Sequence, residues 1–126
     1  MTMVLDCGAL LALEANDRAM WRRYKCARLA GFPPVSHGGV VGQAWRGGGP
    51  RQALLATALS GIDIRPLDDT LGRKAGALLG QAAAADVIDA AVVLLAEDGD
   101  EIVTSDPKDL APLAARADLH VDVVPT

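Results

Sequence analysis

The stretch from Ala85 to Leu110, ADVIDAAVVLLAEDGDEIVTSDPKDL, constrains the fold most, because it predicts a buried helix and then a short buried strand. Asp86 opens the helix, where a carboxylate caps free amide groups and complements the helix dipole. Residues 90–96 are apolar on nearly every side, so this helix is expected to pack against a sheet. Ile102 and Val103 are β-branched and predict the strand.

The rest of the chain repeats this alternation of short strands and helices. Alternating strands and helices predict an α/β fold with a mainly parallel sheet and helices on both faces. The 126 residues contain no repeat or low-complexity segment, so we expect a single domain over residues 1–126. The segment 32–35 is either a linker or an edge strand, with Ser36 capping the helix after it. Further strands are expected at residues 3–5, 62–65 and 120–124.

Several features bear on the compartment. No apolar run approaches the roughly 20 residues of a membrane span. The N-terminus lacks a basic region ahead of its apolar run and contains Asp6, which argues against a signal peptide. Cys7 and Cys26 have no metal-ligand or redox spacing. We therefore expect a cytoplasmic protein with no membrane association.

Charge is distributed unevenly along the chain. The formal net charge of −4 removes overall basicity as an argument for nucleic acid, although a local basic face remains compatible with it. A helix is expected from Asn16 or Asp17 to about Ala30. It is either an ordinary amphipathic surface helix or a basic face near a polyanion. Its cations are Arg18, Arg22, Arg23, Lys25 and Arg28.

The glycine-rich middle of the chain offers weaker signals. The run of glycines at 47–49 lacks the Lys-Ser/Thr of a phosphate-binding loop and is interpreted as a turn. His37 has no partner nearby in sequence and is expected to be solvated rather than catalytic. His120 is interpreted in the same way.

Carboxylates stand at the boundaries of several expected elements. Asp6 follows the first strand, Asp106 ends the strand at 102–103, and Asp86 opens the long helix. Because these two strands would end side by side at one edge of the sheet, the three carboxylates are expected to converge there. Asp89 and Asp109 would lie nearby. Alternatively, helix capping and solvated turns explain each aspartate separately.

Convergence of these carboxylates would have a chemical consequence. Like charges at close range raise each other's pKa and oppose folding unless a cation neutralises them. Oxygen ligands without His or Cys suit Mg²⁺ or Mn²⁺ rather than Zn²⁺. A divalent ion held by carboxylates is a common means of activating water against a phosphodiester. The pattern therefore indicates metal-assisted phosphoryl chemistry.

Four segments, in this order and at these separations, resemble a known family: VLDCGALLAL, VVGQAWRGG, DVIDAAVVLLA and IVTSDPKDL. Together they look like a PIN domain, specifically the VapC-type toxin ribonucleases of bacterial toxin–antitoxin pairs. The resemblance implies a three-layer α/β/α sandwich, a Mg²⁺- or Mn²⁺-dependent endoribonuclease, and inhibition by a cognate antitoxin. By match to the family's motifs, the acidic metal site falls on Asp6, Asp86 and Asp106, with Asp89 and Asp109 as additional contributors.

Two residues depart from the family's pattern. The second acidic position, usually Glu, falls on Gln43, and the Ser or Thr that usually follows the first Asp is Cys7. Both changes weaken the expected metal affinity, and Asp89 can restore the charge count. Arg46 lies on roughly the same helix face as Gln43. Two interpretations of Arg46 stay open: it is expected either to contact an RNA phosphate or an antitoxin carboxylate, or to be an ordinary surface arginine.

Two functions therefore remain open from the sequence. The leading hypothesis is a metal-dependent endoribonuclease toxin, acting as a homodimer on an RNA substrate and neutralised by a cognate antitoxin. The alternative is a PIN-like module that has lost cleavage and binds RNA or an antitoxin peptide, as Gln43 and Cys7 would favour. A phosphoacceptor domain is set aside, because Asp6 has no acidic neighbour.

Overall fold

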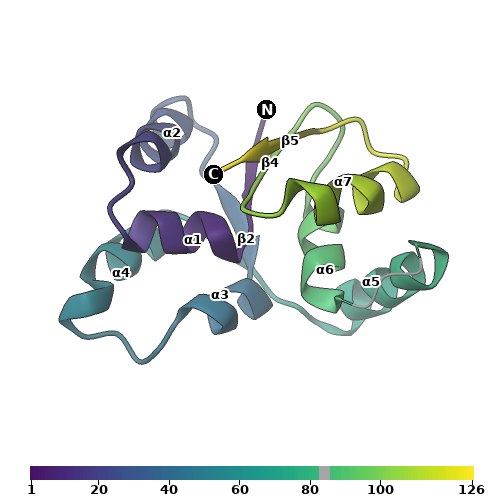
Figure 1. Cartoon of the computed structure of the whole chain (residues 1–126), viewed down its shortest axis with the longest axis horizontal. Coiled ribbons are helices and arrows are strands. Elements are labelled where there is room, and N and C mark those ends of the chain that lie inside the picture. Colours follow the sequence, from purple (N-terminus) through teal and green to yellow (C-terminus); the bar gives the residue numbers. More distant parts are fainter. Residues whose placement is uncertain (83–85) are drawn as a thin grey trace.

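The chain folds as an α/β protein around a five-stranded sheet in which every pairing is parallel (Figure 1). The structure is a computed structural model that describes residues 1–82 and 86–126, so Ala85 lies outside it. The strand order is β3-β2-β1-β4-β5. The expected fold class is therefore confirmed.

The elements match the expected alternation closely. The strands are β1 Met3–Leu5, β2 Val35–His37, β3 Asp63–Arg65, β4 Glu101–Thr104 and β5 Asp122–Pro125. The helices are α1 Cys7–Glu14, α2 Arg18–Leu29, α3 Gly38–Ala44, α4 Ala53–Leu59, α5 Asp69–Ala82, α6 Val87–Leu95 and α7 Pro107–Arg116, with a 3₁₀ turn η1 at Pro50–Gln52.

The helices form two layers. Helices α1 to α4 lie on one side of the sheet and α5 to α7 on the other (Figure 1). Right-handed crossovers account for this arrangement, because the chain moves from β1 outward to β2 and β3, then returns across the sheet to β4 and β5. The result is the three-layer α/β/α sandwich that was expected.

The centre of the sheet is also the centre of the hydrophobic core. Val4, Leu5, Ile102 and Val103 of β1 and β4 are completely buried. Residues 90–93 of α6 are completely buried as well, in agreement with the apolar character of this helix on nearly every side. In the described ranges, no single helix is both long and apolar enough to cross a bilayer. Helices α5 and α6 taken together are long and apolar enough, but the angle between them is 108°.

One strand lies elsewhere than expected. The segment 32–35 was expected to be a linker or an edge strand. Residues 32–34 instead precede β2, and β2 lies between β1 and β3 in the sheet. Ser36 does not cap a helix. It lies within β2, fully buried, and its hydroxyl donates to the carbonyl of Leu5 at 2.8 Å. The side chain therefore ties β2 to β1.

The expectation that His37 is solvated is wrong, because this side chain is completely buried. Its Nδ1 accepts from the amide of Gly39 at 3.0 Å and caps α3, and its Nε2 lies 3.0 Å from the carbonyl oxygen of Ile88. Burial lowers the pKa of His37, which keeps the imidazole neutral. His120 is exposed, as expected.

Gly8 allows α1 to begin close to the loop after β4. A Cβ at this position would overlap the Ser105 hydroxyl and lie 3.0 Å from the Ser105 backbone nitrogen. We therefore expect Gly8→Ala to lower the free energy of unfolding by about 1–3 kcal/mol in urea titrations. Gly76→Ala is the matched control, because its Cβ would meet no atom within 4 Å and the change favours α5 by about 0.5–1 kcal/mol. Equal stability of the two variants would contradict this packing.

Candidate functional site

An open cavity of about 380 Å³ lies at the carboxyl ends of β1 and β4. The order of the sheet reverses between these two strands, and such a switch point is where open α/β sheets bind ligands. Gln43, Arg46 and Cys7 line the cavity, together with all the acidic residues that the sequence analysis selected. These are Asp6, Asp86, Asp89, Asp106 and Asp109.

Asp6 is the buried member of this acidic group. It caps α1, where its Oδ1 accepts from the amide of Ala9 at 3.0 Å, and its Oδ2 accepts from the Thr104 hydroxyl. Burial raises the pKa of Asp6, while the Thr104 hydroxyl and nearby backbone N–H groups oppose that rise. The one carboxylate of Asp6 thus caps α1 and also lines the cavity.

Thr104 joins the ends of the two central strands and was missed in the sequence analysis. Its hydroxyl donates to Asp6 and accepts from the amide of Asp106 at 2.8 Å. One side chain therefore orients the Asp6 carboxylate and shapes the turn that carries Asp106. Its position at the end of a buried strand, two residues before Asp106, was the available signal.

The other two principal acids stand at helix starts. Asp86 caps α6, with its Oδ1 accepting from the amides of Ile88 at 2.9 Å and Asp89 at 3.2 Å. Asp106 occupies the corresponding position at α7, but its carboxylate makes no capping bond. Capping thus accounts for Asp86 and leaves Asp106 unexplained by helix stability.

Asp89 experiences the accumulated negative charge most strongly. Burial raises its pKa to about 6, and the neighbouring carboxylates of Asp86, Asp6, Asp109 and Asp106 contribute to the rise in that order. The acids therefore lie close enough to repel one another. A positive charge placed among them would relieve this repulsion.

Two further predicted residues lie at the rim of the cavity. Gln43 is near the end of α3, whereas Arg46 lies two residues beyond this helix, so the expectation that both share one helix face is wrong. Gln43 and Arg46 are both exposed and both line it. The Arg46 Nη1 donates to the carbonyl oxygens of Gly42 at 3.0 Å and Trp45 at 2.7 Å. Its backbone amide donates to Oε1 of the buried Gln52 at 2.9 Å.

Gln52 is a second residue that the sequence analysis missed. Its Oε1 also accepts from the amide of Gly48 at 3.0 Å, and its Nε2 donates to the carbonyl of Ala44 at 3.0 Å. The side chain therefore holds the end of α3 and the glycine-rich turn together. No local pattern in the sequence distinguishes it from a surface glutamine.

Cys7 lies half-buried beside the acids. Burial raises the pKa of its thiol, the Asp6 carboxylate adds to this rise, and the Arg46 guanidinium opposes it. The group is thus a neutral thiol at neutral pH. Hard cations prefer oxygen, so Cys7 is a poor candidate ligand.

The side chains that line the cavity suit a hard divalent cation by the chemistry of their ligand atoms, although they are not spaced as a complete ligand set. In residues 1–82 and 86–126, no group of three or more His, Cys, Asp or Glu side chains is arranged to hold a metal ion. Five carboxylates nonetheless offer oxygen donors around the cavity, and the Cys7 sulfur is the other side-chain donor type among them. Mg²⁺ keeps several waters and takes only one or two protein carboxylates directly, so this set is chemically suited to it.

Comparison with known proteins adds no assignment. A scan against models of known protein families finds no match, and a search of curated proteins also finds none.

We expect the charge on Asp89 to destabilise the metal-free fold. A folded pKa of about 6 against an ordinary value of 3.8 means that the native state binds more protons, so stability falls as pH rises through this interval. Asp89→Asn should therefore raise the free energy of unfolding at pH 7 by about 1–2 kcal/mol after allowance for solvent screening.

The increase in the free energy of unfolding caused by Asp89→Asn should disappear below about pH 4, where the Asp89 carboxyl is protonated in both the folded and the unfolded state. Urea unfolding in EDTA at a series of pH values measures the effect. Asp63→Asn is the matched control on an exposed carboxylate of β3, outside the cavity. A stabilisation by Asp89→Asn that is equal at all pH values would refute the charge explanation.

Proposed function

We propose that this protein is a metal-dependent endoribonuclease of the PIN-domain, VapC-like kind, cleaving RNA phosphodiester bonds and neutralised by a cognate antitoxin. The proposal includes action as a homodimer. The observation that carries it is a single cavity, at the switch point of a parallel sheet, lined by five aspartates. One of them has its pKa raised to about 6 by burial and by its acidic neighbours.

The residues of the acidic cavity would have different roles. Asp6, Asp86 and Asp106 would hold Mg²⁺ or Mn²⁺, with Asp89 and Asp109 contributing negative charge. When bound, the ion supplies a Lewis acid and an activated water for attack on phosphorus. Thr104 keeps the Asp6 carboxylate in place through its hydroxyl. Arg46, the cation on the rim, would bind a phosphate oxygen of the RNA.

A second function has its own support. Gln43 lines the cavity where the family usually carries Glu, and the acids in the described part of the chain do not form a three-residue metal-ligand group. A PIN-like module that binds RNA or an antitoxin peptide without cleaving it would have these features. A cleavage assay separates the two functions.

Asp6→Asn should slow cleavage strongly while keeping the fold. Asn retains a side-chain oxygen for the Ala9 amide and is a good helix cap, but it removes the charge that a metal requires. We expect the purified, antitoxin-free protein to cleave total RNA in Mn²⁺ or Mg²⁺. The variant should be slower by about 100-fold or more, the equivalent of about 2.7 kcal/mol.

Asp17→Asn is the matched control, because Asp17 caps α2 in the same manner and does not line the cavity. It should cleave like the unmodified protein. Equal cleavage by the Asp6 variant would indicate a contaminating nuclease. No cleavage by any of the three proteins would favour the binding module.

Gln43→Glu should tighten Mn²⁺ and Mg²⁺ binding, because it adds a carboxylate to the rim of the cavity. The apparent dissociation constant should fall about tenfold, equivalent to about 1.4 kcal/mol. Calorimetric titration of metal into the metal-free protein measures it, with Gln81→Glu on α5 as the control for net charge. Unchanged or weaker binding would show that Gln43 does not face the ion.

A further inference from the structure

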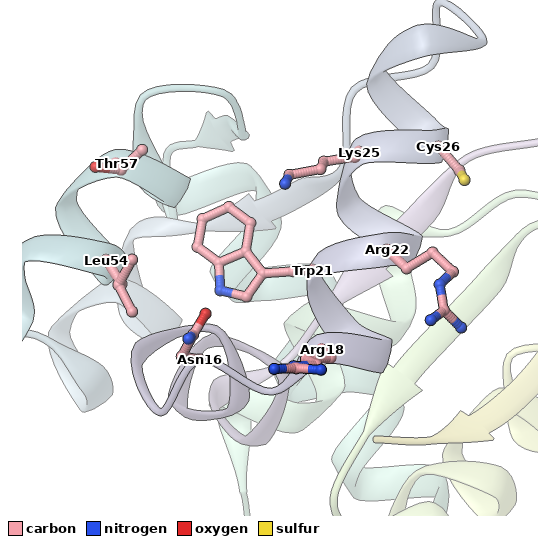
Figure 2. A pocket seen from close by; sticks show the side chains of 8 residues that line it. All are labelled: Asn16, Arg18, Trp21, Arg22, Lys25, Cys26, Leu54 and Thr57. Atoms are coloured by element: carbon pink, nitrogen blue, oxygen red, sulfur yellow. The ribbon is translucent and has the colours of Figure 1, made fainter.

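A second cavity, of about 630 Å³, lies between α2 and α4 (Figure 2). Asn16, just beyond the last turn of α1, is part of its lining, whereas Asp6 stands before the first turn of α1 at the acidic cavity. The eight residues of α1 span about 12 Å, so the two cavities lie near opposite ends of one short helix.

The α2 side of this cavity carries an unusual concentration of positive charge. Helix α2 has five of the chain's twelve Lys and Arg residues and no acidic residue, although the chain as a whole has a net charge of −4. Arg18, Arg22 and Lys25 line the cavity, one helical turn apart (Figure 2).

This charge pattern works against the stability of α2. Arg18 lies in the first turn, where the positive end of the helix dipole repels a cation. Arg18 and Arg22 are four residues apart, a like-charge spacing that destabilises a helix by a few tenths of a kcal/mol. Helix stability therefore does not account for these cations, and a bound anion would.

The cations of the cavity are available to a ligand. Arg23, on another face of α2, pairs with Glu101 at 3.9 Å. Among the residues that the structure describes, no salt bridge involves Arg18, Arg22 or Lys25. All three are exposed.

An aromatic ring, that of Trp21, lies on the same side of α2 as Arg18 and Lys25 (Figure 2). The Nε1 of Trp21 donates to the carbonyl of Leu13 at 3.0 Å, and the ring packs edge-on against Tyr24 with centroids 5.0 Å apart. These contacts fix the orientation of the indole. Lys25 Nζ lies 6.0 Å from its centroid, and Leu54 faces it across the cavity (Figure 2).

We propose that this groove binds a single-stranded segment of RNA. Cations that follow the phosphate backbone, combined with a fixed aromatic ring on which a base stacks, are the usual elements of single-strand recognition. Arg18, Arg22 and Lys25 contact phosphates, and Trp21 with Leu54 receives a base. An acidic peptide would use the cations but would have no need of a stacking surface. The identity of the anion as RNA rests on the proposed ribonuclease function.

Fluorescence anisotropy with a labelled oligouridylate of about 12 nucleotides, in EDTA, tests the groove without cleavage. The Arg18→Ala/Arg22→Ala/Lys25→Ala variant should bind at least about tenfold more weakly at about 50 mM salt. Its slope of log affinity against log salt should be smaller by about 2, the value expected for the loss of three phosphate contacts. Trp21→Leu should weaken binding about fivefold or more.

The matched control is Arg65→Ala/Lys74→Ala/Arg116→Ala, which removes the same charge from exposed residues of β3, α5 and α7 outside the groove. It should bind within about twofold of the unmodified protein. Circular dichroism and thermal melting establish that each variant is folded. An equal loss in both triple variants, or in neither, would overturn the groove proposal.

An oligoglutamate peptide of the same charge serves as the competing probe. If it displaces the RNA at equal concentration, the groove is a peptide site and the proposal is wrong. The outcome is independent of cleavage. RNA binding that is lost only in the groove variant supports the groove proposal even if Mn²⁺ elicits no cleavage. If the groove variant binds the oligouridylate as tightly as the unmodified protein does, and the unmodified protein cleaves RNA, the groove proposal is refuted and the proposed ribonuclease function stands.

Discussion

The parallel pairing of β1 with β4, in which Leu5 lies opposite Val103, is the constraint on which the acidic cavity depends. The amide of Asp6 continues this ladder by donating to the Val103 carbonyl at 3.3 Å. The Thr104 hydroxyl then binds the Asp6 carboxylate. Residues almost a hundred positions apart are thus held together at the carboxyl ends of two buried central strands, and a slip of one residue in the register would separate them.

Helix starts make this concentration of carboxylates tolerable. Asp6, Asp86 and Asp106 stand immediately before α1, α6 and α7, and all three line the cavity. The positive ends of three helix dipoles therefore face the acids. This compensation is incomplete, because burial and, after it, the neighbouring carboxylates still raise the pKa of Asp89 to about 6. The remaining repulsion is what a divalent cation would remove.

The parts of the fold that the sequence predicted are those determined locally. The apolar run of α6 and the boundary acids Asp6 and Asp86 are recognisable from a few neighbouring residues. The residues that were missed or misjudged act through distant partners. The buried His37 contacts the carbonyl of Ile88, 51 positions away, and Thr104 binds a carboxylate 98 positions earlier. Such pairs can be recognised only when the order and register of the strands are known.

The net charge of −4 conceals two regions of opposite charge in this protein. The acids lie before the first turn of α1, and the α2 cations lie beyond its other end. A separation of about 12 Å along α1 exceeds the Debye length of about 8 Å at physiological salt, so the regions neutralise each other only weakly. Each therefore needs its own counter-charge. A divalent cation would neutralise the acids and a phosphate backbone the cations of α2, and one RNA chain is long enough to reach both the ion and these cations at once.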